Sequence, residues 1–314
     1  MGKVVIGIHG LRNKPEQSLL QERWKAAILE GLNEQEYGTQ SFSFELVYWA
    51  NVLYKSPLHQ DQDFKFDDRY DSYPYHPLKG KPPEYKDSWR DEVRQAVSSR
   101  LDNALDYLSN ELGFTKASDE VLALLFEEMR LYYSYFQEDN SKIAMVPDRH
   151  GSKKPMLKVL RGLLKDCLLS HQNDEILLVA HSMGTIISYD VLRELEHEHP
   201  NFTIQHYATI GSPLGLYFVK SRILKEWGEW GDVRVPSNVK KRWKNYSDKK
   251  DKVAALDTHL SDDFSKNAQG IQVEDDMVLN SYRRPIDNEI DHHSEWGYLR
   301  TPEISRQFIE FLKS

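Results

Sequence analysis

The sequence lacks the features that mark most secreted and membrane proteins. Cys167 is its single cysteine, so no intramolecular disulfide can form. No run of about eighteen apolar residues occurs, and the apolar stretch at residues 4–6 is too short for the core of a signal peptide. We therefore expect a cytoplasmic protein without an integral membrane segment.

The sequence also lacks a positive net charge and motifs for nucleotide cofactors. The chain has 41 Lys and Arg against 49 Asp and Glu, a formal net charge of −8, which disfavours binding to nucleic acid. It contains neither a G-x-x-x-x-G-K-[ST] loop nor a G-x-G-x-x-G turn after a strand, so we expect no nucleotide cofactor. His292 and His293 lie near Asp287, Glu289 and Asp291, but no second cluster completes a metal site. The expected partner is a small molecule.

Short apolar runs separated by helical patterns dominate the rest of the chain. The 7 Trp, 12 Phe and 17 Tyr among its 314 residues supply a sizeable core. The runs read as strands buried on both faces, and lie at residues 3–8, 44–50, 175–180 and 204–210. Helical spacing follows at residues 18–32 and 185–198, and again at 304–313 after Thr301-Pro302-Glu303. This alternation predicts one α/β domain over residues 1–314, with a doubly wound, mostly parallel sheet.

The alternation stops between residues 55 and 150. A polar, aromatic-rich stretch comes first, followed by helical patterns around residues 93–112 and 121–136. We interpret 55–150 as a largely helical insertion between strands. It is expected to form a cap or lid over a site, the alternatives being a solvated decoration or an oligomer contact.

Ser182 stands in a pattern typical of a serine nucleophile. It follows the aliphatic residues 176–179 and precedes a helical pattern, which gives a strand, a sharp turn and a helix. Ala180 and Gly184 are small, as the close approach of the backbone in such a turn requires. A helix beginning at Met183 directs free N–H groups at an oxygen that becomes negative during acyl transfer.

The segment Ala-His-Ser-Met-Gly at 180–184 resembles the G-H-S-M-G turn of lipases and esterases in the α/β-hydrolase superfamily, with Ala180 at its first position. The His-Gly pair at 9–10 resembles the pair that these lipases carry after an early strand. The resemblance implies an oxyanion hole formed by backbone N–H groups of Met183 and of Gly10 or Leu11.

A Gly-Ser-Pro turn at 211–213 also resembles lipases, although Gly and Pro end many strands. The first predicted strand begins at residue 3, so the two antiparallel strands that usually precede it in this family are not expected. The resemblance therefore implies a minimal α/β-hydrolase fold with about six strands.

A serine needs a histidine to accept its proton and a carboxylate to orient that histidine. In this family the order is serine, acid, histidine. Residues 243–254 resemble the W-x-N-x-x-D-x-x-D-x-V-A stretch of some lipase-like hydrolases, in which the second aspartate is the acid. This implies Asp251, with Asp248 as the alternative, although alternating charges are also common in solvated turns.

The histidine is expected shortly before the closing helix. Related lipases often show H-S-x-[YW] there, and His293 fits that register better than His292. His259 and His206 are weaker candidates.

Together these residues predict a serine hydrolase that cleaves carboxylic esters through an acyl-enzyme on Ser182. The resemblance alone favours lipid-like esters. An amidase, a thioesterase or an acyltransferase could use the same residues, and a catalytically inactive binding module also remains open.

Overall fold

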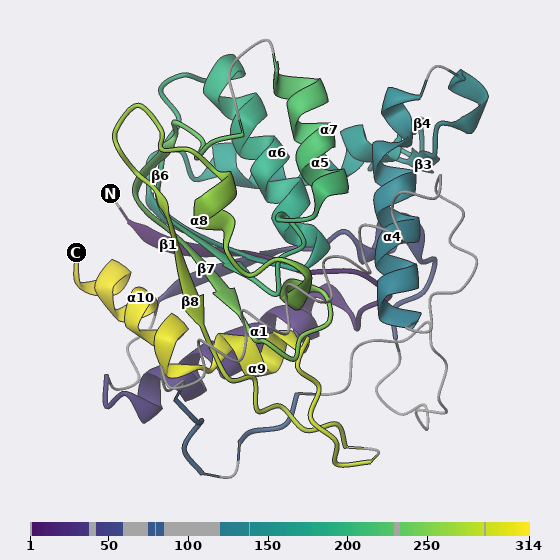
Figure 1. The fold of residues 1–314 in the computed structure, drawn as a ribbon. Coiled ribbons are helices and arrows are strands. Elements are labelled where there is room, and N and C mark those ends of the chain that lie inside the picture. The colour runs from purple at the N-terminus through teal and green to yellow at the C-terminus, as the bar shows by residue number, and fades with distance from the viewer. Residues whose placement is uncertain are drawn as a thin grey trace.

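The fold is built on a parallel six-stranded sheet (Figure 1). This computed structural model describes residues 2–37, 42–58, 75–78, 80–84, 120–137, 139–228, 233–285 and 287–314, without the side chains of 120–124. The strand order is β2-β1-β5-β6-β7-β8, and every neighbouring pair is parallel. The strands are β1 (Lys3–Ile8), β2 (Ser43–Val47), β5 (Glu175–His181), β6 (Ile204–Ile210), β7 (Val239–Ser247) and β8 (Val273–Met277). The predicted α/β fold with a mostly parallel sheet of about six strands is confirmed.

Helices cover both faces of the sheet (Figure 1). Helices α1 (Gln17–Glu34), α9 (Glu295–Leu299) and α10 (Pro302–Lys313) pack together on one face. Helices α5 (Met156–Ser170), α6 (Met183–Glu198) and α7 (Tyr217–Trp227) lie on the other. The remaining elements are α2 (Ala50–Leu53), α4 (Glu120–Tyr132), α8 (Leu260–Asp263), the 3-10 turns η2 (Tyr133–Phe136), η3 (Asn140–Lys142) and η5 (Ala254–Leu256), and an antiparallel hairpin of β3 (Met145–Pro147) and β4 (Lys153–Pro155).

Alternation along the central strands divides the core into two layers. In β5, Leu177 and Val179 join the layer under α1 and α10, whereas Ile176 and Leu178 join the layer under α5 and α6. Side chains on both faces of a parallel strand are buried, which explains why these strands are continuous apolar runs in the sequence. Strand β2 is shorter than the predicted 44–50, because the chain after Val47 turns out of the ladder.

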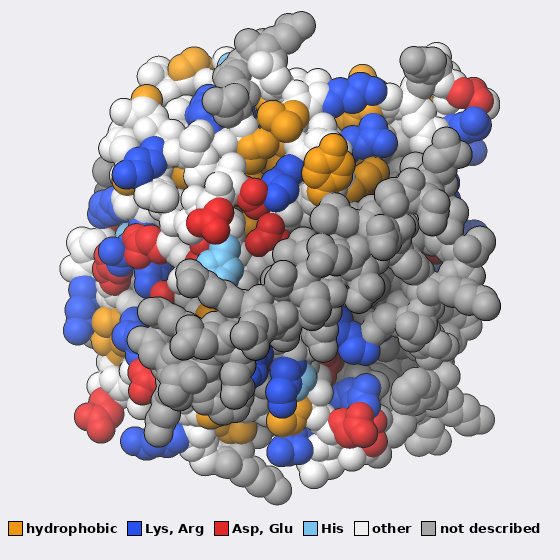
Figure 2. All heavy atoms as spheres, in the orientation of Figure 1, with side chains coloured by type: hydrophobic (Ala, Val, Ile, Leu, Met, Phe, Trp, Pro, Cys, Tyr) orange, Lys and Arg blue, Asp and Glu red, His pale blue; other side chains and the backbone are white. Residues whose placement is uncertain are grey.

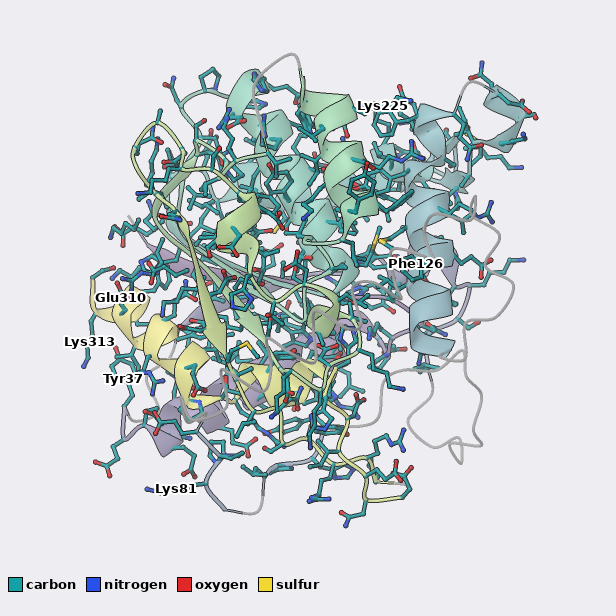
Figure 3. All side chains as sticks on the ribbon, in the orientation of Figure 1. Tyr37, Lys81, Phe126, Lys225, Glu310 and Lys313 are labelled. Atoms are coloured by element: carbon teal, nitrogen blue, oxygen red, sulfur yellow. The ribbon has the colours of Figure 1, made fainter. Side chains whose placement is uncertain are left out.

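The two ends of the described chain lie close together. The Lys3 ammonium donates hydrogen bonds to the carbonyl oxygens of Phe311 (2.9 Å) and Leu312 (3.2 Å) in the last turn of α10. Lys313 lies over the ring of Tyr37, 5.1 Å from its centroid (Figure 3). A cation at a helix C-terminus stabilises the last carbonyl groups, which carry partial negative charge. These contacts therefore hold α10 against β1 and the end of α1.

Only parts of the predicted insertion lie within the described residues. The helix expected around 121–136 is present as α4 and the η2 turn, whereas the one expected around 93–112 lies outside the described residues. Buried Arg161 of α5 joins α4 to α6, because its guanidinium donates to Tyr132 (2.8 Å) and Asp190 (2.7 Å). The role of 55–150 as a cap stays a prediction.

Charged side chains of both signs are spread over the visible described surface (Figure 2). Among the helices that the structure describes, none is both long and apolar enough to span a membrane.

Candidate active site

Ser182 occupies a strained turn at the carboxyl end of β5. Its φ of 52° and ψ of −125° lie in a left-handed region that non-glycine residues rarely adopt, and α6 begins at the next residue. Its own N–H donates to the carbonyl oxygen of Ile210 on β6 (3.1 Å). A Cβ at Gly184 would lie 2.7 Å from the carbonyl oxygen of His9, so the turn closes directly against the end of β1. The small residue expected there is thus required by backbone contact.

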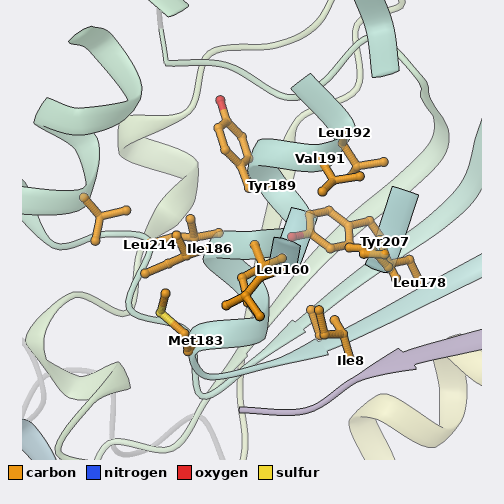
Figure 4. Packing of buried hydrophobic residues seen from close by; sticks show 14 of the residues in the cluster. Ile8, Leu160, Leu178, Met183, Ile186, Tyr189, Val191, Leu192, Tyr207 and Leu214 are labelled. Carbon is orange, nitrogen blue, oxygen red and sulfur yellow. The ribbon is translucent and has the colours of Figure 1, made fainter. Parts of the chain in front are cut away.

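Apolar packing supports the turn from below. The side chain of Met183 is buried in one cluster with Leu160, Ile186 and Leu214 (Figure 4). Because this cluster fixes the first turn of α6, the N–H groups of that turn keep a fixed direction relative to Ser182.

The structure brings Ser182, His293 and Asp251 together. His293 Nε2 lies 3.0 Å from Ser182 Oγ, and His293 Nδ1 lies 2.9 Å from both carboxylate oxygens of Asp251. A carboxylate accepts the proton of Nδ1, which leaves Nε2 free to accept the hydroxyl proton of Ser182. The arrangement can activate the serine as a nucleophile.

Asp251 is fully buried, and its carboxylate is held by further donors. The backbone N–H groups of Val253 (2.9 Å) and Ala254 (3.3 Å) donate to Oδ1, and the hydroxyl of Tyr298 donates to Oδ2 (2.7 Å). Burial and the two neighbouring aspartates raise the pKa of Tyr298 well above its usual value, so its proton stays on the hydroxyl. These contacts hold the carboxylate within hydrogen-bond distance of His293 Nδ1.

The alternative residues form a separate pair. His292 Nδ1 lies 3.1 Å from Asp248 Oδ2, and Asp248 also accepts the backbone N–H of Lys250 (2.8 Å). His259 Nδ1 lies 2.9 Å from the hydroxyl of Thr258, and His206 lies against Phe311 of α10. Within the described residues, only Asp251 and His293 among these candidates belong to the series of side-chain hydrogen bonds that ends at Ser182 Oγ. Asp248 adjoins this series through its backbone, because its carbonyl oxygen accepts the N–H of Asp251 (3.0 Å).

Gly10 and Met183, both predicted for the oxyanion hole, lie next to Ser182. A Cβ at Gly10 would lie 2.7 Å from the Cβ of Ser182, which leaves no room for a side chain there. Leu11 follows in the same buried loop, and Met183 provides the first N–H of α6. The backbone at Gly10 and the start of α6 thus both lie next to Ser182, where an oxyanion hole needs its N–H donors.

His9 fixes the loop that carries Gly10. Its Nδ1 donates to the carbonyl oxygen of Gly10 (2.7 Å), and its Nε2 accepts the backbone N–H of Trp49 (3.0 Å). The ring stacks on Trp49 at 4.8 Å, so the chain just after β2 packs against the loop that follows β1. Burial and the nearby Lys14 ammonium lower the pKa of His9 to about 3, so the ring stays neutral and keeps Nε2 as an acceptor.

This neutral histidine predicts a loss of stability in acid. Between pH ~6.5 and ~3 the unfolded chain binds a proton at His9 and the folded chain does not, so the free energy of unfolding falls as the pH falls. One such proton corresponds to about 1.4 kcal/mol per pH unit. Urea unfolding at several pH values between 4 and 7 should show a shallower pH dependence for His9→Gln than for the wild type. Equal slopes would contradict the prediction.

Three further residues contact the site without having been predicted for it. Tyr298 is the first, and His181 is the second, because its Nε2 donates to the carbonyl oxygen of His293 (2.9 Å). Burial lowers the pKa of His181 well below its usual value, so the ring is neutral. Gly211 is the third, since at its φ of 56° a Cβ would lie 3.0 Å from Asp251 Oδ2 and 3.2 Å from the His293 ring. In the sequence, Gly211 and His181 lie in the Gly-Ser-Pro and Ala-His-Ser-Met-Gly segments, whereas Tyr298 gave no signal.

Helix α4 reaches the edge of the site through one buried carboxyl group. Glu128 accepts the hydroxyl proton of Tyr54 (3.3 Å) and the backbone N–H of Arg12, which follows Leu11. Burial raises the pKa of Glu128 to about 7. The described part of the predicted insertion is thus attached to the loop that carries Gly10 and Leu11.

Acidic and histidine side chains around the site are paired with other groups. Glu289 pairs with Arg284 (2.8 Å), and Glu295 forms a buried ion pair with Lys14 (3.5 Å). Across the described ranges, no three His, Cys, Asp or Glu side chains are grouped so that they could hold a metal ion.

Comparison of the chain with models of known protein families gives no match. A search among curated proteins likewise finds no significant relative. Any function for this site must therefore be argued from its geometry.

Proposed function

We propose that the chain is a serine hydrolase of the α/β-hydrolase type that cleaves carboxylic esters. The observation that carries the proposal is the hydrogen-bonded series Ser182–His293–Asp251, with Ser182 on a left-handed turn between β5 and α6. The strand order and the placement of all three residues after carboxyl ends of parallel strands support the same conclusion.

In the proposed reaction, Ser182 Oγ attacks the ester carbonyl carbon while its proton passes to His293 Nε2. The C–O bond to the alcohol then breaks, and the alcohol leaves with the proton from Nε2. A water molecule repeats the sequence on the acyl-enzyme, which releases the acid and restores Ser182. Asp251 orients His293 and stabilises its imidazolium form in both halves.

The negative oxygen of each tetrahedral intermediate would be held by N–H groups of Met183 and of Gly10 or Leu11. The dipole of α6 adds to this stabilisation because its positive end lies at Met183. The buried floor of the turn excludes water beneath the reacting groups, which strengthens these interactions.

A fluorophosphonate probe tests the proposal, because it labels only serines that are activated as nucleophiles. We expect stoichiometric labelling of the folded protein at Ser182, located by mass spectrometry, and none in Ser182→Ala. Ser188→Ala is the matched control, since Ser188 of α6 is also buried, and within the described residues its hydroxyl bonds to Thr185 and Tyr207 instead of a histidine. Failure of the folded wild type to react would refute the proposal and favour an inactive binding module.

Substrate class is tested on the unlabelled protein, because the probe blocks Ser182. A panel of p-nitrophenyl esters, thioesters and anilides of matched acyl chains should show the highest kcat/KM with the oxygen esters. Faster cleavage of the anilides would instead identify an amidase.

A further inference from the structure

Asn280 makes four hydrogen bonds next to the proposed base. Its backbone N–H donates to Asp248 Oδ2 (2.7 Å), and its side-chain oxygen accepts the N–H of Tyr282 (3.1 Å). Its Nδ2 donates to the carbonyl oxygens of His292 (3.1 Å) and Ser294 (2.8 Å). These two carbonyl groups lie on either side of His293 in the chain.

The surroundings leave little freedom to this side chain. Asn280 is 2% exposed, and a Cβ on Gly297 of α9 would lie 1.5 Å from its Oδ1. With the bond from His181 to the carbonyl oxygen of His293, three consecutive carbonyl groups accept hydrogen bonds from buried side chains. The backbone that carries the His293 ring is thus fixed from below.

We infer that Asn280 is a positioning residue for His293. It holds the backbone on both sides of the imidazole so that Nε2 stays within hydrogen-bond distance of Ser182 Oγ. This inference rests on the proposed function for its catalytic consequence. A misplacement of about 1 Å at a reacting group can lower the rate on the order of 10²-fold, even when no contact with the substrate is lost.

Asn280→Asp is a sharp test because aspartate has the same shape but no donor. A carboxylate at this position would face the carbonyl oxygens of His292 and Ser294, and would repel both. Asn280→Ser, which removes the two donors without adding charge, provides a second variant if the first does not fold.

Asn267 offers a closely matched control at the other end of β8. It is 5% exposed, its Nδ2 donates to two carbonyl oxygens, of Pro236 and Val239 (both 3.1 Å), and its Oδ1 accepts two backbone N–H groups, of Gln269 (3.1 Å) and Ile271 (3.0 Å). Asn267→Asp therefore imposes the same chemical change before β8, whereas the site lies after the strands. Both variants should lower the urea midpoint to a similar extent.

The expected results distinguish a displacement of His293 from a general loss of folding stability. Asn280→Asp should lower kcat for a p-nitrophenyl ester on the order of 10²-fold with KM changed less than about threefold, while Asn267→Asp keeps kcat within about twofold. The low-field proton NMR signal of His293 Nδ1–H, assigned by its absence from His293→Gln, should shift in Asn280→Asp only. An unchanged kcat in Asn280→Asp and Asn280→Ser, or an equal fall in Asn267→Asp, would overturn the inference.

Failure of this inference can be told apart from failure of the proposed function. If the wild type hydrolyses the ester and Asn280→Asp does so equally fast, the proposed function stays intact and only the role of Asn280 is removed. A wild type that neither reacts with the fluorophosphonate nor hydrolyses any ester would refute the proposed function, and the NMR signal would then still report whether Asn280 positions His293.

Discussion

Asp251→Asn should lower kcat for a short-chain ester on the order of 10⁴-fold. An amide at this position can donate its N–H to His293 Nδ1, which then holds the imidazole in the tautomer with the proton on Nε2. That tautomer cannot accept the proton of Ser182 Oγ, although the geometry is nearly unchanged. Steady-state kinetics on a p-nitrophenyl ester measures the effect, and circular dichroism shows whether the variant is folded.

Asp248→Asn is the matched control, since both aspartates are fully buried and each lies within hydrogen-bond distance of a histidine Nδ1. Because Asp248 faces His292, its amide variant should lower kcat less than about tenfold. The reverse order of the two effects would show that Asp248 is the acid, and that the hydrogen bond between Asp251 and His293 has only a structural role.

The largest loss of stability is expected from Gly184→Ala. The added methyl group would lie 2.7 Å from the carbonyl oxygen of His9 and 2.8 Å from that of Ile8. The backbone at the end of β1 and the turn at Ser182 would have to move apart. We expect a fall of about 3 kcal/mol in the free energy of unfolding, measured in urea, which is at the upper end of typical overpacking costs. The fluorophosphonate should also react more slowly, because this movement separates Gly10 from Ser182.

Gly162→Ala tests whether the loss comes from the close contact or from the substitution itself. Gly162 is also helical, in α5, but a Cβ there meets no atom within 4 Å. Its replacement should stabilise the protein by about 0.5–1 kcal/mol, since alanine has the higher helix propensity. Similar losses in both variants would contradict the contact argument.

Strands and helices with strong apolar patterns were predictable from the sequence. The runs at 3–8, 175–180 and 204–210 became β1, β5 and β6, because a strand between two helical layers is apolar on both faces. Strand β8 gave no such signal. Its sequence Val-Glu-Asp-Asp-Met lies at the edge of the sheet, where Glu274 pairs with Arg242 and Asp276 pairs with Lys244. Asp275 accepts hydrogen bonds from Asn245 and from two backbone N–H groups.

The residues of the candidate site that lie in recognisable local sequence patterns could be predicted. Ser182 lies in a turn whose small neighbours are visible in the chain, and the resemblance to lipases indicated Asp251 and His293. The contacts of Asn280 and Tyr298 join segments that are far apart in sequence or are made to backbone groups, and no local pattern encodes them. Such positioning groups can be found only once the tertiary structure is known.

At Ser182, the residue type that best fits the left-handed backbone differs from the residue type that supplies a hydroxyl group. Glycine is the residue that adopts this conformation without strain, and it is also the residue that has no hydroxyl group. If only conformational strain mattered at this position, glycine would therefore be favoured over serine. Serine at this position therefore carries a conformational cost that glycine would avoid.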